Sequence, residues 1–277
     1  MKMMGKWQIS RNLVRLAMIL LILSPAMGFA FFYGNFSSGL LFGQLHLTDP
    51  LAFFQMLLAS PAEMTLGFLV SALIILVLYV LLGRVFCSWI CPLGAVLEWI
   101  AKLRFIPSRQ QNSSAGKFQI KYQILGLLLL ISLLGSLPIF LLFSPMAMFE
   151  RILMFGLSLS LIFIICILSL DIILGKGFWC HNTCPLGAFY SLVGRWRVLG
   201  LNIDEGSCNG CGTCWEECPV GEEVIKPAIK NQDPNLVHAD CTNCGDCIDN
   251  CPQDALRFGF RIEKGMPLGK TSWEPES

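Results

Sequence analysis

The chain has 277 residues, of which 55% are hydrophobic and 14% are charged, and its formal net charge at pH 7 is +1. So small a net charge, with few Lys and Arg residues, excludes a basic surface for binding nucleic acid. The apolar fraction exceeds that of ordinary soluble domains and predicts a membrane protein.

Four apolar stretches are long enough to cross a bilayer core as helices, which takes roughly 20 residues. They cover residues 13–33, 66–83, 122–143 and 152–174. Lys and Arg residues gather before the first stretch and after the second, whereas residues 34–65 contain none. Because positively charged loops stay in the cytoplasm, the pattern predicts an α-helical membrane protein. It would have four transmembrane helices in two repeated pairs, and both termini in the cytoplasm.

The segment between the first two predicted spans includes a short amphipathic helix in "LTDPLAFFQMLLAS". Thr48 is a typical N-cap residue, and Pro50 suits the first helical turn. His46 and Asp49 precede this helix, and both side chains can accept a proton. Asp49 also suits the positive end of a helix. Two interpretations remain open, a proton acceptor and a helix-end charge.

The sequence Cys-x-x-x-Cys-Pro-Leu-Gly-Ala occurs twice, at the ends of the second and fourth predicted spans. Cys87 and Cys91 form one pair and Cys180 and Cys184 the other, each spaced so that both thiols share one helix face. A two-fold relation between the halves would bring the pairs together. The spacing leaves three interpretations open: a shared four-thiol metal or cluster site, a redox-active dithiol, and a structural or docking element.

Three other side chains near these motifs need an interpretation. His181, inside the second motif, is a candidate ligand or proton acceptor, although a histidine at such a boundary is often only solvated. Asp171 is an ionisable group near the end of the fourth predicted span, which makes it a functional candidate unless it reaches water. Cys166 lies among Ile and Leu residues and is predicted to be a small core residue.

The C-terminal part carries the strongest pattern, since most of the 13 cysteines lie in metal-type spacings. "CNGCGTCWEECP" and "CTNCGDCIDNCP" both have the Cys-x2-Cys-x2-Cys-x3-Cys-Pro spacing of bacterial two-cluster ferredoxins, in which the fourth Cys ligates the other cluster. The spacing predicts a low-potential electron carrier in a reducing compartment. Its two [4Fe-4S] clusters would be held by Cys208, Cys211, Cys214 and Cys251, and by Cys241, Cys244, Cys247 and Cys218.

The alternative to the clusters is a pair of structural zinc sites, since zinc also accepts four thiolates. Zinc sites do not require two interleaved runs, so clusters are favoured. The expected organisation is a transmembrane domain at residues 1–193, an α+β two-cluster ferredoxin-like domain at 194–263, and a polar tail at 264–277.

With these motifs in place, the chain resembles the NapH family, membrane subunits of a quinol dehydrogenase that supplies the periplasmic nitrate reductase. The resemblance extends over nearly the whole chain and includes "GNFSSGLLF" at residues 34–42 and "LTDPL" at residues 47–51. Larger relatives share the repeated Cys motif, among them the regulator of nitrous oxide reductase expression and a copper-reducing assembly factor for cytochrome oxidase. The size of the chain and its outer loop, the segment at residues 34–65 between the first two predicted spans, favour the NapH type.

The resemblance implies a protein of the bacterial cytoplasmic (inner) membrane. It would oxidise quinol from the membrane quinone pool and pass electrons through a periplasmic iron–sulfur partner towards the nitrate reductase. The eight C-terminal cysteines would hold the clusters, and the four cysteines of the repeated motif would have a redox or partner-binding role. The resemblance supplies no quinol site.

A competing hypothesis is an assembly or regulatory factor that reduces a metal, such as copper, or a disulfide on a client protein. Soft thiol and thioether ligands suit copper. The methionines of this chain form no Met-x-Met cluster, which weakens the copper version.

Overall fold

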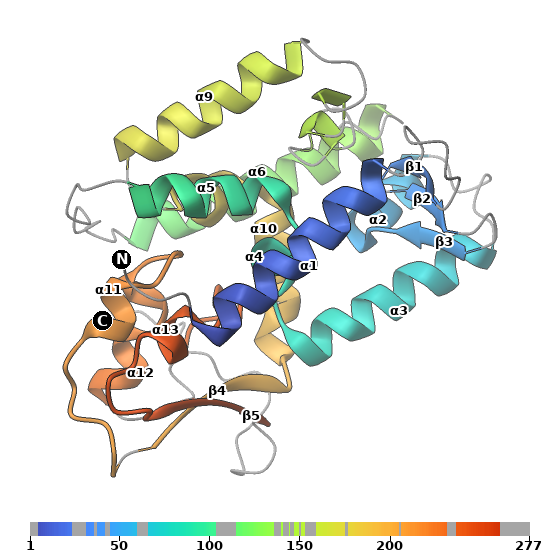
Figure 1. Ribbon diagram of the computed structural model, residues 1–277. Helices are drawn as coiled ribbons and strands as arrows, with labels where there is room; N and C mark the ends of the chain where they lie inside the picture. The colour runs from blue at the N-terminus through green and yellow to red at the C-terminus, as the bar shows by residue number, and fades with distance from the viewer. Residues whose placement is uncertain are drawn as a thin grey trace.

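A computed structural model describes two parts of the chain, a helical region (residues 5–196) and a cysteine-rich region (residues 199–260) (Figure 1). The described residues are 5–23, 32–35, 38–41, 45–59, 66–103, 115–135, 140, 144, 147–149, 151–152, 159–174, 177–204, 206–231 and 237–260. The predicted polar tail, residues 264–277, lies outside them.

The helical region contains the longer helices and a small sheet. The helices are α1 (Lys6–Leu23), α2 (Pro50–Ala59), α3 (Leu66–Leu82), α4 (Phe86–Trp89), α5 (Pro92–Leu103), α6 (Ala115–Gly135), α9 (Leu159–Leu174) and α10 (Pro185–Val193). A π-helical segment, η2 (Trp179–Thr183), precedes α10, and a 3-10 turn, η3 (Gly194–Trp196), follows it. The strands are β1 (Phe32–Asn35), β2 (Ser38–Leu41) and β3 (Leu45–Thr48), which pair antiparallel in the order β1-β2-β3.

The predicted short helix after the third strand is α2, but its N-cap differs from the prediction. Asp49 takes that position in place of Thr48, because its backbone carbonyl accepts the N–H of Phe53 at 2.8 Å. The Asp49 carboxylate also accepts the backbone N–H of Leu51. Both contacts satisfy groups at the start of the helix.

The cysteine-rich region is closed by a two-stranded antiparallel sheet of β4 (Leu199–Ile203) and β5 (Leu256–Phe260). Between the strands lie α11 (Thr213–Glu216), η4 (Glu222–Val224), α12 (Lys226–Lys230) and α13 (Asp246–Asp249). Strand residues Leu201, Ile203 and Leu256 bury their side chains against Ile225 and Ile229. Both predicted cluster runs are therefore packed around one small core.

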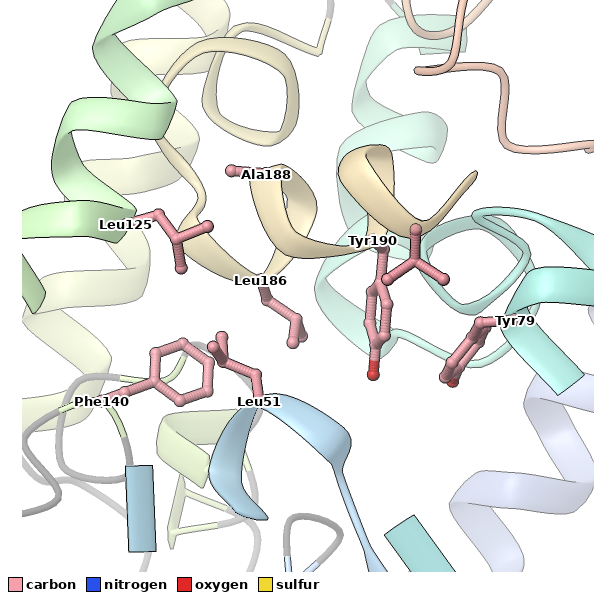
Figure 2. Packing of buried hydrophobic residues seen from close by; sticks show 8 residues of the cluster. Leu51, Tyr79, Leu125, Phe140, Leu186, Ala188 and Tyr190 are labelled. Atoms are coloured by element: carbon pink, nitrogen blue, oxygen red, sulfur yellow. The ribbon is translucent and has the colours of Figure 1, made fainter. Parts of the chain in front are cut away.

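The main core of the helical region lies where α2, α3, α6 and α10 meet. Figure 2 shows Leu51, Leu125 and Leu186 converging with Phe140 on one side, and the rings of Tyr79 and Tyr190 side by side on the other. Because α10 begins directly after Cys184, this core fixes the position of the second Cys-x-x-x-Cys-Pro motif.

Helix α1 joins the two regions, and it crosses the helical region to reach α13 (Figure 1). The carboxylate of Asp249 on α13 accepts the first-turn N–H groups of Trp7 and Gln8, at 3.3 and 3.0 Å. A side chain from the far end of the chain thus caps α1, since first-turn N–H groups have no partner within their own helix.

The prediction of four transmembrane helices is wrong. Within the described ranges, no helix is both long enough and apolar enough to cross a membrane. Helices α3 and α9 have 17 and 16 residues, fewer than the roughly 20 that a bilayer core requires. The first predicted span, residues 13–33, runs beyond the end of α1 into β1. The predicted multi-pass location in the inner membrane, with cytoplasmic termini, is wrong on the same finding.

Candidate functional site

Four thiols line a first cavity in the cysteine-rich region. They belong to Cys208, Cys211, Cys214 and Cys251, and the cavity encloses about 310 Å³ including the open space at its mouth. Cys214 is buried on α11, whereas Cys211 is exposed. This cavity therefore has one thiol at the protein surface.

Four other thiols line a second cavity of about 390 Å³, measured in the same way. They belong to Cys218, Cys241, Cys244 and Cys247, and apolar side chains such as Leu201 and Phe258 complete the wall. In each cavity three thiols come from one run and the fourth from the other. These are the two sets of four that the spacing of the runs predicts.

A glycine stands at the same place in both runs, directly after the second cysteine. Gly212 and Gly245 have φ angles of 90° and 82°, in the region that favours glycine. The space that a Cβ would take is filled by the ring of Trp215 at Gly212 and by Trp7 of α1 at Gly245. At the second cavity the tryptophan against this glycine therefore comes from the other end of the chain.

The four thiols of the repeated motif also lie together, in the helical region. Each of three of them interacts electrostatically with at least two of the others. We call this group the thiol quartet; it consists of Cys87, Cys91, Cys180 and Cys184. No group of three or more His, Cys, Asp or Glu side chains is placed to hold a single metal ion in the parts of the chain described here.

The two copies of the motif have the same local geometry. The N–H of Cys91 bonds to the carbonyl of Phe86, and the N–H of Cys184 to that of Trp179, both at 2.9 Å and both spanning five residues. Such π-type turns are rare and occur frequently at functional sites. The proline that follows each cysteine then opens α5 or α10.

The second thiol of each copy lies at the start of the helix that follows. Cys91 accepts the N–H groups of Leu93 and Gly94, and Cys184 accepts those of Leu186 and Gly187. Burial nevertheless raises the pKa of Cys91 to about 12 and that of Cys184 to about 11. Buried thiols of this kind lose their protons when a bound metal centre compensates the negative charge of the thiolates.

Asp240, directly before Cys241, ties the thiol quartet to the second cavity. Its carboxylate lies 2.6 Å from Lys121 Nζ, 2.9 Å from Arg84 Nη1 and 3.2 Å from His181 Nδ1. Burial by itself would raise the pKa of Asp240, but the hydrogen bond with His238 and the charges of Lys121 and Arg84 hold it well below the ordinary value. Burial lowers the pKa of His181 to about 4, so His181 is neutral at pH 7.

Further hydrogen bonds attach the loop after Asp240 to α4, the helix that carries Cys87. Ser88 Oγ donates to the carbonyl of Thr242 at 2.8 Å, and the Trp89 indole donates to the carbonyl of Asn243 at 3.1 Å. The Asn243 amide donates to the carbonyl of Leu82 at 2.7 Å. The loop that holds Cys241 and Cys244 is therefore fastened beside the first motif.

The remaining candidates from the sequence have different outcomes. Asp171 is buried and accepts the N–H groups of Gly177 and Trp179, at 3.1 and 2.9 Å, so it positions the segment before Cys180. The prediction that Cys166 is a core residue is wrong, because its side chain is exposed. His46 lies in β3, but its side chain is outside the described part. Asp49 accepts a hydrogen bond from Tyr190, and burial raises its pKa to about 6.

Sequence reasoning missed the buried cations around these thiols. In the sequence pattern, Arg11, Arg15 and Arg84 count as signals for membrane orientation. All three are buried: Arg11 and Arg15 pair with Glu98, and Arg84 pairs with Asp240. Their position close to apolar stretches was the available signal, but nothing local indicated the partners.

Two protein-family models match the chain. One is described as a 4Fe-4S binding domain and matches residues 64–110 and 155–203, and the other is described as a 4Fe-4S dicluster domain and matches residues 200–261. Among curated proteins, methylamine utilization ferredoxin-type protein MauN of Paracoccus denitrificans is 33% identical over 240 residues, which cover 84% of this chain and 82% of that protein. Ferredoxin-type protein NapH of Escherichia coli is 32% identical over 232 residues, with 83% and 80% covered.

The chain belongs to the NapH and MauN family of ferredoxin-type proteins. It is a 4Fe-4S electron-transfer protein. The residues present fit this cofactor, because four thiols surround each cavity of the cysteine-rich region and cysteine thiolates are the usual ligands of iron–sulfur clusters. No solved structure matches this ferredoxin-type chain.

Proposed function

We propose that this chain takes electrons from quinol and passes them singly to an iron–sulfur partner protein in a nitrate or methylamine system. The family of NapH and MauN supports the general role. The observation that carries the proposal is the set of contacts that joins the thiol quartet to the second cavity, since an electron route requires neighbouring sites.

In this proposal two sets of cysteines in the cysteine-rich region hold the clusters, and the thiol quartet holds a further cluster or metal. A [4Fe-4S] cluster, when bound, accepts and releases one electron at a time. The match of a 4Fe-4S binding domain to both copies of the repeated motif supports the third site. The cluster ligands are Cys208, Cys211, Cys214 and Cys251 at the first cavity, and Cys218, Cys241, Cys244 and Cys247 at the second.

The contacts suggest an order for the three sites. The hydrogen bond between Ser88 and Thr242 links the residues next to Cys87 and Cys241, so the second cavity follows the thiol quartet. The first cavity comes last, because its exposed Cys211 gives a partner protein access. Oxidation of quinol to quinone releases two electrons and two protons; the electrons leave one after the other by this route.

The two protons that quinol releases need an acceptor near the start of this electron route. Asp49 is our candidate, because its pKa of about 6 lets it bind and release a proton near neutral pH. Its partner Tyr190 is on α10, which begins after Cys184. Through this hydrogen bond to α10, Asp49 is connected to the thiol quartet by the core of the helical region.

The first experiment is an anaerobic titration of the purified full-length protein with a reduced quinol analogue, followed by electron paramagnetic resonance and visible bleaching. Dithionite serves as the full-reduction control. We expect quinol to reduce the clusters of the native protein. The Cys87→Ser and Cys180→Ser variants should lose quinol-dependent reduction, while dithionite still reduces the clusters of their cysteine-rich region.

Cys166→Ser is the matched control, since this exposed cysteine lines neither cavity of the cysteine-rich region and is not part of the thiol quartet, and it should behave as the native protein. If only dithionite reduces the native protein, with and without partner present, the quinol proposal is wrong and the assembly-factor hypothesis takes its place. If Cys87→Ser and Cys180→Ser are reduced by quinol like the native protein, the proposed order of sites is wrong.

A further inference from the structure

A third cavity lies between the helical region and the cysteine-rich region. It encloses about 570 Å³, open space at its mouth included. Its wall contains Cys87 and Cys180 of the thiol quartet on one side, and Pro219, Val220 and Thr242, which also line the second cavity, on the other. Since three arginines complete the wall, we call it the arginine cavity; they are Arg11, Arg15 and Arg84.

These arginines are almost completely removed from solvent, with exposed fractions of 0% for Arg11, 4% for Arg15 and 1% for Arg84. Glu98 is the carboxylate in the cavity wall, and it pairs with both Arg11 and Arg15. Carboxylates outside the wall complete the pairing, Asp246 with Arg11 and Asp240 with Arg84. Each ion pair uses only part of a guanidinium group, which has five N–H donors.

Several N–H groups of these arginines have no acceptor within the described part of the chain. They are Nε of all three arginines and Nη1 of Arg11. An unsatisfied buried donor destabilises the folded protein. Four such donors on residues that line one cavity favour a negatively charged acceptor at this place.

We propose that Arg84, with Arg11 and Arg15, forms a cationic shell for a negatively charged metal–sulfur centre held by the thiol quartet. This inference rests on the third site of the proposed function. Four thiolates around an iron–sulfur core give net negative charge, and hydrogen bonds to sulfur together with net charge set the reduction potential. The shell supplies both.

Arg84 is the member closest to the thiols. Its guanidinium is within hydrogen-bonding reach of the Cys87 thiol and donates to the carbonyl of Cys180 at 2.6 Å. It thereby touches both copies of the motif, while Nη1 holds Asp240. Reduction adds an electron, so the buried cation stabilises the reduced state and raises the potential of the site.

The test is a redox titration of the full-length protein followed by electron paramagnetic resonance, with iron and acid-labile sulfide measured per chain. Signals of the native protein beyond those of the cysteine-rich region are assigned by their loss in Cys91→Ser and Cys184→Ser. In Arg84→Gln we expect one-electron reduction of this centre to become about tenfold less favourable, which is a shift of about 59 mV to lower potential. Arg84→Lys, which keeps the charge, should recover most of the shift.

Arg15→Gln is a second variant, because Glu98 stays paired with Arg11 when the Arg15 guanidinium is lost. This variant should shift the reduction potential in the same direction. The matched control is Arg197→Gln. Arg197 is equally buried but donates to the carbonyls of Val237 and His238 outside the arginine cavity, so its loss should leave this potential unchanged.

The outcomes separate the two proposals. If the native protein shows no centre beyond those of the cysteine-rich region, the third site of the proposed function is wrong and the inference falls with it. If the centre is present, and neither Arg84→Gln nor Arg15→Gln moves its potential more than Arg197→Gln does, the cationic shell alone is wrong.

Discussion

At Asp49, burial and hydrogen bonding act in opposite directions. The Tyr190 hydroxyl donates to Asp49 Oδ1 at 2.5 Å, and its ring lies 4.2 Å from that of Tyr79, as Figure 2 shows for the two tyrosines. Burial dominates and raises the pKa of Asp49 to about 6, although the bonds from Tyr190 and Leu51 lower it. The carboxyl group is therefore protonated more easily in the folded chain than in the unfolded chain.

This shift predicts how stability changes with pH. A carboxyl group with a raised pKa favours the folded state fully at low pH, and that contribution is lost as pH rises through the folded-state value. The free energy of unfolding of the native protein, compared with Asp49→Asn, should therefore decrease between about pH 4 and pH 7. Tyr190→Phe, which removes the opposing hydrogen bond, should make the decrease larger. Denaturant unfolding at several pH values measures it, and identical pH profiles for native protein and Asp49→Asn would contradict it.

At the scale of single elements, the start of α10 is packed too closely for any side chain at Gly187. A Cβ there would collide with Arg84 Nη2 and lie 2.9 Å from the carbonyl of Cys180. The equivalent glycine of the first motif, Gly94, has the carbonyl of Cys87 in the same position. The glycine of each Cys-Pro-Leu-Gly sequence is thus explained by the backbone of its own first cysteine.

Gly187→Ala should destabilise the protein by about 1–3 kcal/mol, the usual cost of overpacking. Gly126→Ala is the matched control, because Gly126 lies in α6 with no atom within 4 Å of its added Cβ. That substitution should stabilise by roughly 0.5–1 kcal/mol through helix propensity. Urea unfolding of both variants provides the measurement. Equal stability of the two variants would contradict this prediction and show that the start of α10 can accommodate a Cβ at Gly187.

At the scale of the whole molecule, α1 holds the cysteine-rich region against the helical region. Its first turn is capped by Asp249, its Arg11 bonds to Asp246 at 2.7 Å, and its Trp7 packs on Phe258 with ring centroids 4.8 Å apart. The N-terminal end of α1 therefore covers the second cavity.

Asp249→Ala should loosen this attachment, since loss of a helix cap costs about 1 kcal/mol. We expect amide hydrogen exchange in the first turns of α1 to become roughly fivefold faster, as such a free energy implies. Glu216→Ala serves as control, because Glu216 is an exposed acidic residue on α11. Unchanged exchange in Asp249→Ala would mean that Trp7 and Arg11 hold α1 without the cap.

The sequence predicted local features well and long-range ones poorly. The α2 helix after β3, the equivalence of the two Cys-x-x-x-Cys-Pro copies and the family all follow from short patterns. The transmembrane interpretation failed because counting apolar residues does not show how long a helix is: in the described part of the chain α1 covers Lys6–Leu23, and α3 and α9 have 17 and 16 residues. Arg11 and Arg15 looked like loop charges, although they are buried in ion pairs.

The sequence by itself determined that this is a ferredoxin-type iron–sulfur protein, because the spacing of cysteines within one run governs which thiols can reach one cluster, whatever surrounds them. Only the tertiary structure decided what surrounds the thiol quartet. Arg11 reaches Glu98 and Asp246 across 87 and 235 residues of chain, and no local pattern encodes such pairs. They form because the packing of α1 against both regions brings these charged side chains together.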